Sequence, residues 1–389
     1  MRAVSLGIDF SNMCFRALFT CKYNNAEDIS TFDTEKECAI FARKVVTDIT
    51  ALVKLFSPNK AYLMIDSKNP WRNDVCKDYK GTRKRDESIN MKNIFATMGD
   101  ILDILEARGF KTLHADRGEA DDMASLLKAK IQWQKNESVI FVTSDADWQQ
   151  LVDFDVNTKQ YFCVYNPIAG KNSTTKFYCT EAFYNWMFGA DINTDIYCDY
   201  TNTKRKISEA RAMNPKMTFV QINPTDVLIN KILLGDDGDN VPTFYHYYGK
   251  TGRIVRLTEN KLNKVKEICG DFHTLNELTE VVKSGKFVEA LGKVFKQDVS
   301  TLDGNIRLSQ QRLYVDLNPS LFPKKIIEGF EESYNKGLNE AYTNLPRRTE
   351  DVVKGTKFEK IVRADNGAKL NKIFAGFIDK SIPSANELF

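Results

Sequence analysis

Three short apolar runs in the first 145 residues each lead into aspartate, and this pattern constrains the fold more than any other feature. The runs are Val4–Asp9, Ala61–Asp66 and Val139–Thr143, the last followed by Asp145. Runs of this length are typical of buried strands, and segments with helical spacing separate them. Strands that alternate with helices predict an α/β fold, in which helices cover both faces of a mostly parallel central sheet.

The remaining expected elements of this layer follow the same alternation. They are, in chain order, helix Glu35–Phe56, helix Ile94–Arg108, strand Lys111–His114, helix Glu119–Gln132 and a hairpin of Tyr161–Tyr165 with Lys176–Tyr178. After about residue 181 the strand pattern fades. Residues 191–217 are polar and irregular, which predicts a loop-rich insertion.

The rest of the chain has mainly helical patterns. They lie at Asp226–Leu234, Lys261–Cys269 and Leu275–Val282. We therefore expect a first domain at 1–185, a mainly helical second domain at 186–345, and a basic tail at 346–389 that contains an amphipathic helix.

Composition excludes several classes of protein. The 389 residues are 42% hydrophobic with a net charge of only +3, so general disorder is excluded. No apolar run approaches the roughly 18–20 residues of a membrane span, and the start reaches Asp9 before a signal-peptide core could form. We expect a soluble, intracellular protein.

The cysteines and histidines leave little room for zinc or histidine chemistry. The eight cysteines form no CxxC pair, which indicates free thiols in a reducing compartment. The three histidines form no HExxH motif. If the chain is an enzyme, its chemistry falls to carboxylates, Lys, Arg or Tyr.

Carboxylates are concentrated where the predicted strands end. The carboxyl ends of parallel strands meet at one edge of a sheet, where ligands bind. That edge receives Asp9, Asp66, Asp145 and Asp147, while the GEADD segment adds Glu119, Asp121 and Asp122, and LLGDDGDN adds Asp236 and Asp239. Any one of these residues could be a turn residue or a helix cap.

The whole set is harder to explain without cations. Two unit charges about 4 Å apart repel by about 4 kcal/mol at an effective dielectric near 20. Several such pairs would consume most of a typical stability of about 5–15 kcal/mol. Oxygen ligands without His or Cys favour Mg²⁺ or Mn²⁺, and two such ions catalyse displacement at phosphorus.

A cationic segment follows the second predicted strand. Residues 67–93 contain Trp71, Arg72, Lys77, Tyr79, Lys80, Arg83, Lys84, Arg85 and Lys92. Cations interleaved with aromatic side chains are typical of single-strand nucleic-acid binding. A charge run alone is usually a solvated face, but its place beside a predicted metal-ligand strand favours a nucleic-acid function.

Four motifs together resemble the 5′ nuclease (flap endonuclease) superfamily. They are IDSKNPWRNDVCKDYKGTRKRDE, GEADDMAS, FVTSDADWQQL and KILLGDDGDNVP, in the order and at the intervals of that family. The later stretch RLYVDLNPSLFPKKIIEGFEESYN and the Glu-Leu-Phe ending resemble the ribonucleases H of T-even-type bacteriophages. The resemblance covers most of residues 1–345 and implies a PIN-like (resolvase-like) sheet, a helical arch at about 67–93 and a helix-three-turn-helix-type domain.

The resemblance also implies a role for each site residue. Asp9, Asp66, Glu119 and Asp121, with Asp122 close by, match ligands of a first metal, and Asp145, Asp147, Asp236 and Asp239 match those of a second. Lys80 and Arg83 match residues that contact the scissile phosphate, and Tyr79 one that stacks on a base.

The implied reaction is phosphodiester hydrolysis near 5′ ends, which leaves a 5′-phosphate and a 3′-hydroxyl. Its implied substrates are branched or nicked DNA and RNA–DNA hybrids, and its implied role is removal of RNA primers or 5′ flaps during replication. By resemblance, the protein is a phage-encoded monomer that acts in the bacterial cytoplasm.

Two departures from the family pattern leave alternatives open: the segment after GDDGDN differs, and the insertion at 191–217 and the tail after Arg347 match no segment of the family. Family members often follow GDxxDN with a glycine-rich helical hairpin that holds duplex DNA and sometimes K⁺. The run here is VPTFYHYYGKTGRIVR, with only Gly249 and Gly252, so duplex anchoring and K⁺ binding stay open. The NELF ending could dock on a sliding clamp or a single-strand-binding protein, or pack on its own domain.

Three other functions would each explain part of this sequence. An actin-like ATPase would explain GIDFSN but not GEADD or TSDADW. A non-catalytic DNA-binding replication accessory protein predicts lost carboxylates or a lost Lys80 and Arg83 pair, and all are present. A PIN-like ribonuclease without flap specificity would need neither the arch nor the second domain.

Overall fold

The computed structural model describes residues 3–24, 31–82, 86–135, 137–168, 174–189, 200–336 and 345–359. By contacts the chain forms two compact units. The first contains residues 1–67, 86–222 and 324–389, and the second contains 68–85 and 223–323. The domains predicted from the sequence (1–185, 186–345 and 346–389) have other boundaries than these two units. They remain a prediction.

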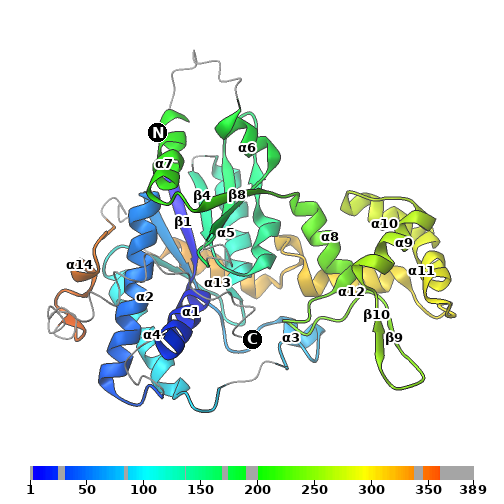
Figure 1. Cartoon of the computed structure of the whole chain (residues 1–389), viewed down its shortest axis with the longest axis horizontal. Coiled ribbons are helices and arrows are strands. Elements are labelled where there is room, and N and C mark those ends of the chain that lie inside the picture. Colours follow the sequence, from blue (N-terminus) through cyan, green and yellow to red (C-terminus); the bar gives the residue numbers. More distant parts are fainter. Residues whose placement is uncertain are drawn as a thin grey trace. The chain divides into compact units, whose positions relative to one another are not determined.

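A central sheet organises the first unit (Figure 1). Its strands are β1 (Ala3–Asp9), β2 (Lys60–Met64), β3 (Lys111–Leu113), β4 (Glu137–Val142), β5 (Asp153–Phe154), β6 (Tyr161–Asn166), β7 (Thr175–Cys179) and β8 (Met217–Gln221). The order is β3-β2-β1-β4-β6-β7-β8, and β5 pairs with β6. Only the β6–β7 and β5–β6 pairs are antiparallel. The predicted mostly parallel sheet and the predicted hairpin are confirmed.

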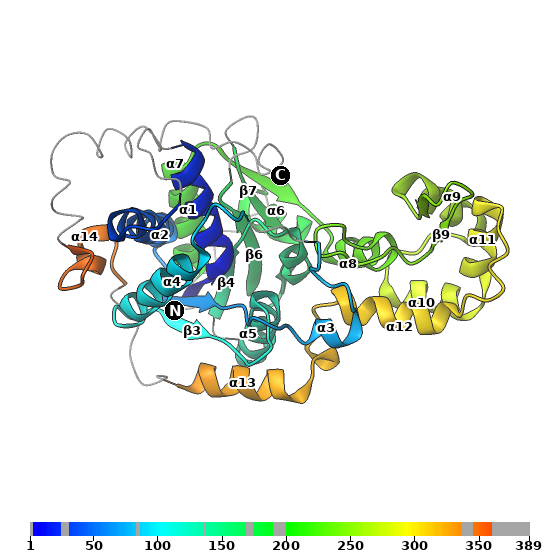
Figure 2. The same cartoon turned by 90° about the horizontal axis from the view of Figure 1, so that it is seen from below.

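Helices cover both faces of this sheet. They are α1 (Phe10–Asn24), α2 (Glu35–Phe56), α4 (Met91–Glu106), α5 (Ala120–Gln134), the 3₁₀ helix η1 (Ala146–Leu151), α6 (Glu181–Phe188), α7 (Tyr200–Met213), α13 (Lys324–Asn335) and α14 (Thr349–Val353). In Figure 2, α1, α2 and α4 lie on one face, and α5 and α13 lie on the other. Leu6 and Ile8 of β1 are fully buried between these layers. Strand β1 is an interior strand of the sheet, with β2 and β4 as its neighbours.

The expected loop-rich insertion at 191–217 is wrong for its described part. Residues 200–213 form α7, and β8 begins at Met217 and pairs in parallel with β7. Helix α7 is dominated by polar residues, so its helical periodicity is weak, and among its described side chains Ile207 and Ala210 are buried. Residues 190–199 lie outside the described part.

The second unit is mainly helical, as expected. It contains α3 (Arg72–Val75), α8 (Pro224–Leu234), β9 (His246–Tyr248), β10 (Ile254–Arg256), α9 (Glu259–Cys269), α10 (Leu275–Lys283), α11 (Lys286–Phe295), α12 (Gly304–Val315) and the 3₁₀ helix η2 (Pro319–Leu321). Its core joins Cys76 and Tyr79 to residues of α8–α12. In the predicted arch, at about 67–93, the described residues before α4 form the four-residue helix α3 and turns. Residues 83–85 of the arch lie outside the described part of the chain.

Part of the tail packs on the first unit. Val352 and Val353 of α14 are buried in its core. Arg108 donates through Nε to the carbonyl of Val352 at 3.1 Å and through Nη2 to that of Lys354 at 2.6 Å. The amphipathic helix predicted within the tail, at residues 369–378, and the NELF ending lie outside the described residues. Among the described residues, no helix is both long and apolar enough to cross a membrane.

Candidate metal centre

Asp9 is the last residue of β1 and lies at the centre of the acidic edge. Its Oδ1 accepts the backbone N–H of Asn12 at 3.0 Å, and its Oδ2 accepts the Thr143 hydroxyl at 2.8 Å. Burial, together with the negative charges of Asp66 and Asp145, raises the pKa of Asp9 to about 8. Carboxylates from the ends of three strands therefore lie close enough to repel one another, as the sequence predicted for this edge.

Asp66 connects this edge to the start of α5. It lies two residues beyond β2, and its Oδ1 accepts the backbone N–H of Ala120 at 2.9 Å. The adjacent Ser67 N–H donates to the carbonyl of Gly118 at 2.8 Å. These bonds hold the segment after β2 against the GEADD segment, so its carboxylates are fixed relative to Asp66.

Three carboxylates gather at the start of α5. Glu119, Asp121 and Asp122 each offer an oxygen atom within 4.8 Å of the other two. Glu119 and Asp122 are buried, and Asp122 Oδ2 accepts the backbone N–H of Glu119 at 3.1 Å in a capping box. The Glu119 side chain accepts from the Asp122 backbone in the same capping box, and Asp121 Oδ1 accepts the Asp122 N–H at 2.8 Å, so all three carboxylates are held by the first turn of the helix.

Asp145 and Asp147 come from the loop after β4 and from η1. Asp145 Oδ1 accepts the backbone N–H of Asp147 at 2.9 Å and so caps η1. The Asp145 N–H donates to Thr143 Oγ1 at 3.0 Å, the same hydroxyl that donates to Asp9. Thr143 thus ties the two strand ends together. Thr143 belongs to the FVTSDADWQQL motif, but it was not predicted as a site residue from the sequence.

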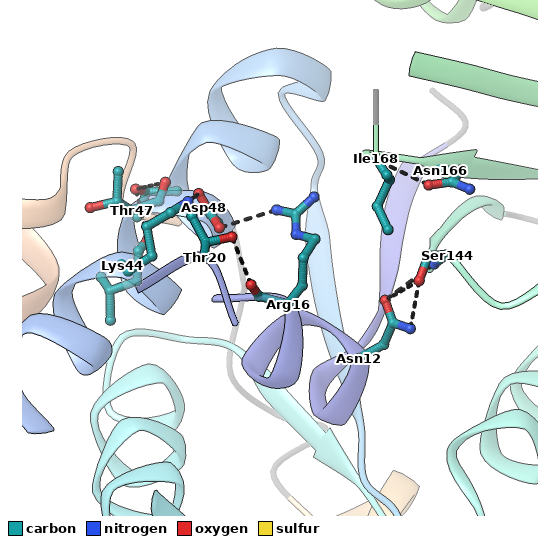
Figure 3. Close-up of polar contacts among 11 residues, drawn as sticks. Asn12, Arg16, Thr20, Lys44, Thr47, Asp48, Ser144, Asn166 and Ile168 are labelled. Carbon is teal, nitrogen blue, oxygen red and sulfur yellow. Dashed lines mark hydrogen bonds and ion pairs between the residues drawn. The ribbon is translucent and has the colours of Figure 1, made fainter. Parts of the chain in front are cut away.

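A second hydrogen-bonded pair, which was not predicted from the sequence, joins the same strand ends. Asn12 Nδ2 donates to Ser144 Oγ at 2.7 Å, and the Ser144 N–H donates to Asn12 Oδ1 at 3.2 Å (Figure 3). Asn12 follows Asp9 by three residues, and Ser144 directly precedes Asp145. The position of these two polar residues, close in sequence to the predicted ligands, is the signal that could have identified them.

Asp236 and Asp239, predicted for the second metal, belong to the second unit, and only their contacts within it are described. Lys231 forms an ion pair with Asp236. Although burial opposes ionisation, the charge and hydrogen bond of Lys231 hold the pKa of Asp236 below its ordinary value. Asp239 Oδ2 accepts the Tyr79 hydroxyl at 3.1 Å and lies 3.7 Å from Lys80 Nζ.

The predicted nucleic-acid residues divide into buried and exposed groups. Trp71, Arg72 and Tyr79 are 5%, 1% and 6% exposed. Arg72 lies over the Trp71 ring at 4.8 Å and near the Phe322 ring at 5.9 Å, all within the second unit. These side chains support the unit's core in this structure, whereas Lys77 is exposed and Lys80 half-buried. Arg83, Lys84 and Arg85 lie outside the described residues.

The oxygen donors fit a divalent metal. Within the described residues of the first unit, the acidic edge combines the buried carboxylates of Asp9, Glu119, Asp122 and Asp147 with the exposed carboxylates of Asp66 and Asp145. Burial first, and then the negative charges of Asp66 and Asp145, raise the pKa of Asp9, as expected at a site where a cation would balance the charge. Fold and edge together define an α/β protein with a mostly parallel sheet and a candidate acidic metal centre at its edge.

Comparisons with known proteins specify the family. Residues 5–183 match the family model for the 5′-3′ exonuclease N-terminal resolvase-like domain. A 5′-3′ exonuclease of Mycoplasmopsis pulmonis is 33% identical over 288 residues, which cover 71% of this chain and 77% of that protein. The chain belongs to the 5′-3′ exonuclease family.

A second relative and a solved structure were also similar to this chain. The 5′-3′ exonuclease of Buchnera aphidicola is 29% identical over 39% of this chain, and the match spans about half (49%) of that relative. The fold resembles that of a bacteriophage T5 flap endonuclease solved with DNA and metal ions, at a TM-score of 0.50 and 17% identity, over 86% of this chain and 98% of that one.

Proposed function

We propose that this chain is a Mg²⁺-dependent 5′ to 3′ exonuclease and flap endonuclease that hydrolyses phosphodiesters near 5′ ends. One observation carries the proposal: Asp9, Asp66 and Asp145 meet at the sheet edge of a chain that belongs to the 5′-3′ exonuclease family. The acidic group at the start of α5 adds ligands to that edge.

Two metal ions would be held by carboxylates alone. Asp9, Asp66, Glu119 and Asp121 would hold one, and Asp145, Asp147, Asp236 and Asp239 the other, with Asp122 in the cap. When bound, such ions stabilise the attacking and leaving oxygens of an in-line displacement. Mg²⁺ suits this all-oxygen set, and Mn²⁺ shares its ligand preference. The proposal does not include K⁺ binding by the segment after the GDDGDN motif, which stays an open alternative.

The cationic side chains would hold the substrate. Lys80 and Arg83 would contact the scissile phosphate, and Lys77, Lys84 and Arg85 would neutralise neighbouring phosphates. The side chains of Trp71, Arg72 and Tyr79 would act by supporting this segment, because they are buried, Tyr79 in the core of the second unit and Trp71 and Arg72 beside Phe322.

The proposed cellular role is removal of RNA primers or 5′ flaps during DNA replication. Nicked or branched DNA and RNA–DNA hybrids would be the substrates. By the resemblance of its motifs, we propose a phage-encoded monomer that acts in the bacterial cytoplasm, with the tail as a docking segment for a sliding clamp or single-strand-binding protein.

A cleavage assay tests the activity directly. Labelled nicked, 5′-flap and RNA–DNA hybrid duplexes would be incubated with Mg²⁺ or EDTA, using wild type, Asp145→Asn and the control Asp103→Asn. Asp103 is exposed on α4. We expect metal-dependent release of short 5′ products, lost in Asp145→Asn and kept in the control. Binding without cleavage in Mg²⁺ or Mn²⁺ would favour the non-catalytic accessory protein.

A further inference from the structure

The second unit contains a β-hairpin where the sequence departs from the family pattern. Strands β9 and β10 pair antiparallel, with Tyr248 opposite Ile254 and Tyr247 opposite Val255. Because side chains alternate across a strand, the two pairs lie on opposite faces of the hairpin. The hairpin therefore has two faces that can be compared directly.

One face of the hairpin is packed. The Tyr247 ring lies 6.0 Å from that of Phe295 in α11, and Tyr245, just before β9, lies 4.9 Å from the same ring. Val255 packs against the core of this unit. These contacts fix the base of the hairpin, so its other face is presented by a rigid support.

The other face is exposed. Tyr248 is 69% exposed and Ile254, its direct cross-strand partner, is 43% exposed. Lys250 and Arg253 are also exposed in the connecting turn. Figure 1 shows the hairpin extending from the helices of this unit, with its turn pointing away from them. An aromatic residue and two cations are thus gathered on a projecting ribbon.

The charge of this segment is entirely positive. Residues 241–258 contain Lys250, Arg253 and Arg256 but no Asp or Glu. Arg256 forms an ion pair with Asp237, which leaves Lys250 and Arg253 as the cations of the turn. A chain whose net charge is only +3 has therefore concentrated positive charge at this point.

We propose that the hairpin face, defined as Tyr248, Lys250, Arg253 and Ile254, binds the phosphate backbone of duplex DNA. A two-stranded β-ribbon fits the major groove of B-DNA. Lysine and arginine contacts to phosphate supply sequence-independent affinity. Charge complementarity favours this polyanion over a protein partner. The inference rests on the proposed function and extends it, since it names the element that holds duplex DNA.

Fluorescence anisotropy in EDTA tests the proposal without turnover. The probes are a labelled duplex and a labelled single strand of equal length, titrated at several salt concentrations. The test variant is the double substitution Lys250→Gln and Arg253→Gln. We expect a loss of about tenfold or more in duplex affinity, a smaller loss for the single strand, and a salt slope reduced by about 1.8 for two lost phosphate contacts.

A matched double substitution controls for total charge. Lys283→Gln and Lys293→Gln remove two exposed lysines of α10 and α11 that are already paired with Glu280 and Glu289. We expect this control to bind duplex as wild type does. Both double variants should keep the wild-type melting temperature, because the substituted side chains are exposed.

Several outcomes would overturn the proposal. They are wild-type affinity in the hairpin variant, an equal loss in the control, an equal loss on the single strand, or a wild type that does not bind duplex. Because this assay needs no cleavage, a failure of nuclease activity would appear separately, in the assay with Asp145→Asn.

Discussion

The Asn12 side chain and Ser144 hydrogen-bond each other across the ends of β1 and β4, with Asn12 Nδ2 donating to Ser144 Oγ at 2.7 Å. The Asn12 backbone N–H also donates to Asp9, and Ser144 directly precedes Asp145. The pair is therefore placed to fix the spacing of two carboxylates. Partners that orient metal ligands typically contribute about 10–100-fold in metal affinity or activity.

Substitution of this pair should slow catalysis through a shared effect. We expect Asn12→Ala and Ser144→Ala each to reduce the single-turnover rate of flap cleavage by about tenfold. The double variant should lose little more than either single variant, because both remove one interaction. Additive losses in this cycle, or unchanged Mg²⁺ concentration for half-maximal rate in both single variants, would contradict a positioning role.

Asp9 should make the metal-free protein less stable at high pH. Its folded pKa of about 8 lies above the ordinary value of 3.8 because of burial and the charges of Asp66 and Asp145. The folded state therefore holds the proton more tightly than the unfolded state. That stability is fully present below about pH 4 and is lost as pH rises through about 8.

Thermal unfolding in EDTA between pH 5 and pH 9, roughly the window set by the Asp9 shift, measures this effect. Each ~1 kcal/mol lost should lower the melting temperature by about 2–4 °C. Asp9→Asn should show a flatter pH profile, because an amide does not titrate. A wild-type profile as flat as that of the variant would show that Asp9 does not titrate in this range.

Divalent metal should stabilise the fold, and more strongly at pH 8 than at pH 6. The metal requires the ionised form of Asp9, which is disfavoured in its absence. At a concentration 100 times Kd, the expected gain is about 2.7 kcal/mol. Calorimetry in EDTA and in Mg²⁺ measures it, and Asp145→Asn should reduce the gain. An unchanged melting temperature would remove the argument from crowded carboxylates.

Tyr79 should contribute to stability more than to base stacking. Its ring is buried in the second unit and its hydroxyl donates to Asp239 at 3.1 Å. We expect Tyr79→Phe to cost about 0.5–1.5 kcal/mol and Tyr79→Ala about 3–5 kcal/mol in urea unfolding. If Tyr79→Ala instead weakened DNA binding with little loss of stability, the residue would be a stacking platform.

Gly329 should be intolerant of even a methyl group. A Cβ there would lie 2.8 Å from the Cβ of Ala115 and 3.0 Å from its Cα, on the segment that leads to Glu119. We expect Gly329→Ala to cost about 1–3 kcal/mol through overpacking, and Ala115→Gly to restore part of it. Gly99→Ala is the control, because a Cβ there meets no atom within 4 Å, and it should stabilise α4 by about 0.5–1 kcal/mol.

The sequence predicted the parallel sheet because its strands are continuous apolar runs, and it predicted the acidic edge because Asp follows those runs. Helix α2 has the predicted bounds of Glu35–Phe56, since a capping box with Thr34 marks its start. Helix α7 was missed because polar residues dominate its sequence, and β8 because it pairs only at the end of the sheet.

Side-chain partners could not be predicted in the same way. Burial of Trp71 beside Arg72 and Phe322 depends on residues about 250 positions apart in the chain, which no local pattern reveals. The pairing of Asn12 with Ser144 spans 132 positions. Local motifs identified the charged groups, while the contacts that orient them are tertiary.

The two units interleave along the chain, and this has a consequence for synthesis on the ribosome. Domains generally fold as units, with the N-terminal one first. Here the first unit still lacks α13 and α14 until the whole second unit has been translated. The Val352 and Val353 side chains that belong to its core emerge only after the second unit has been translated. The residues of the acidic edge are therefore made long before the core behind them is complete, and the helical unit can fold before the unit that carries that edge.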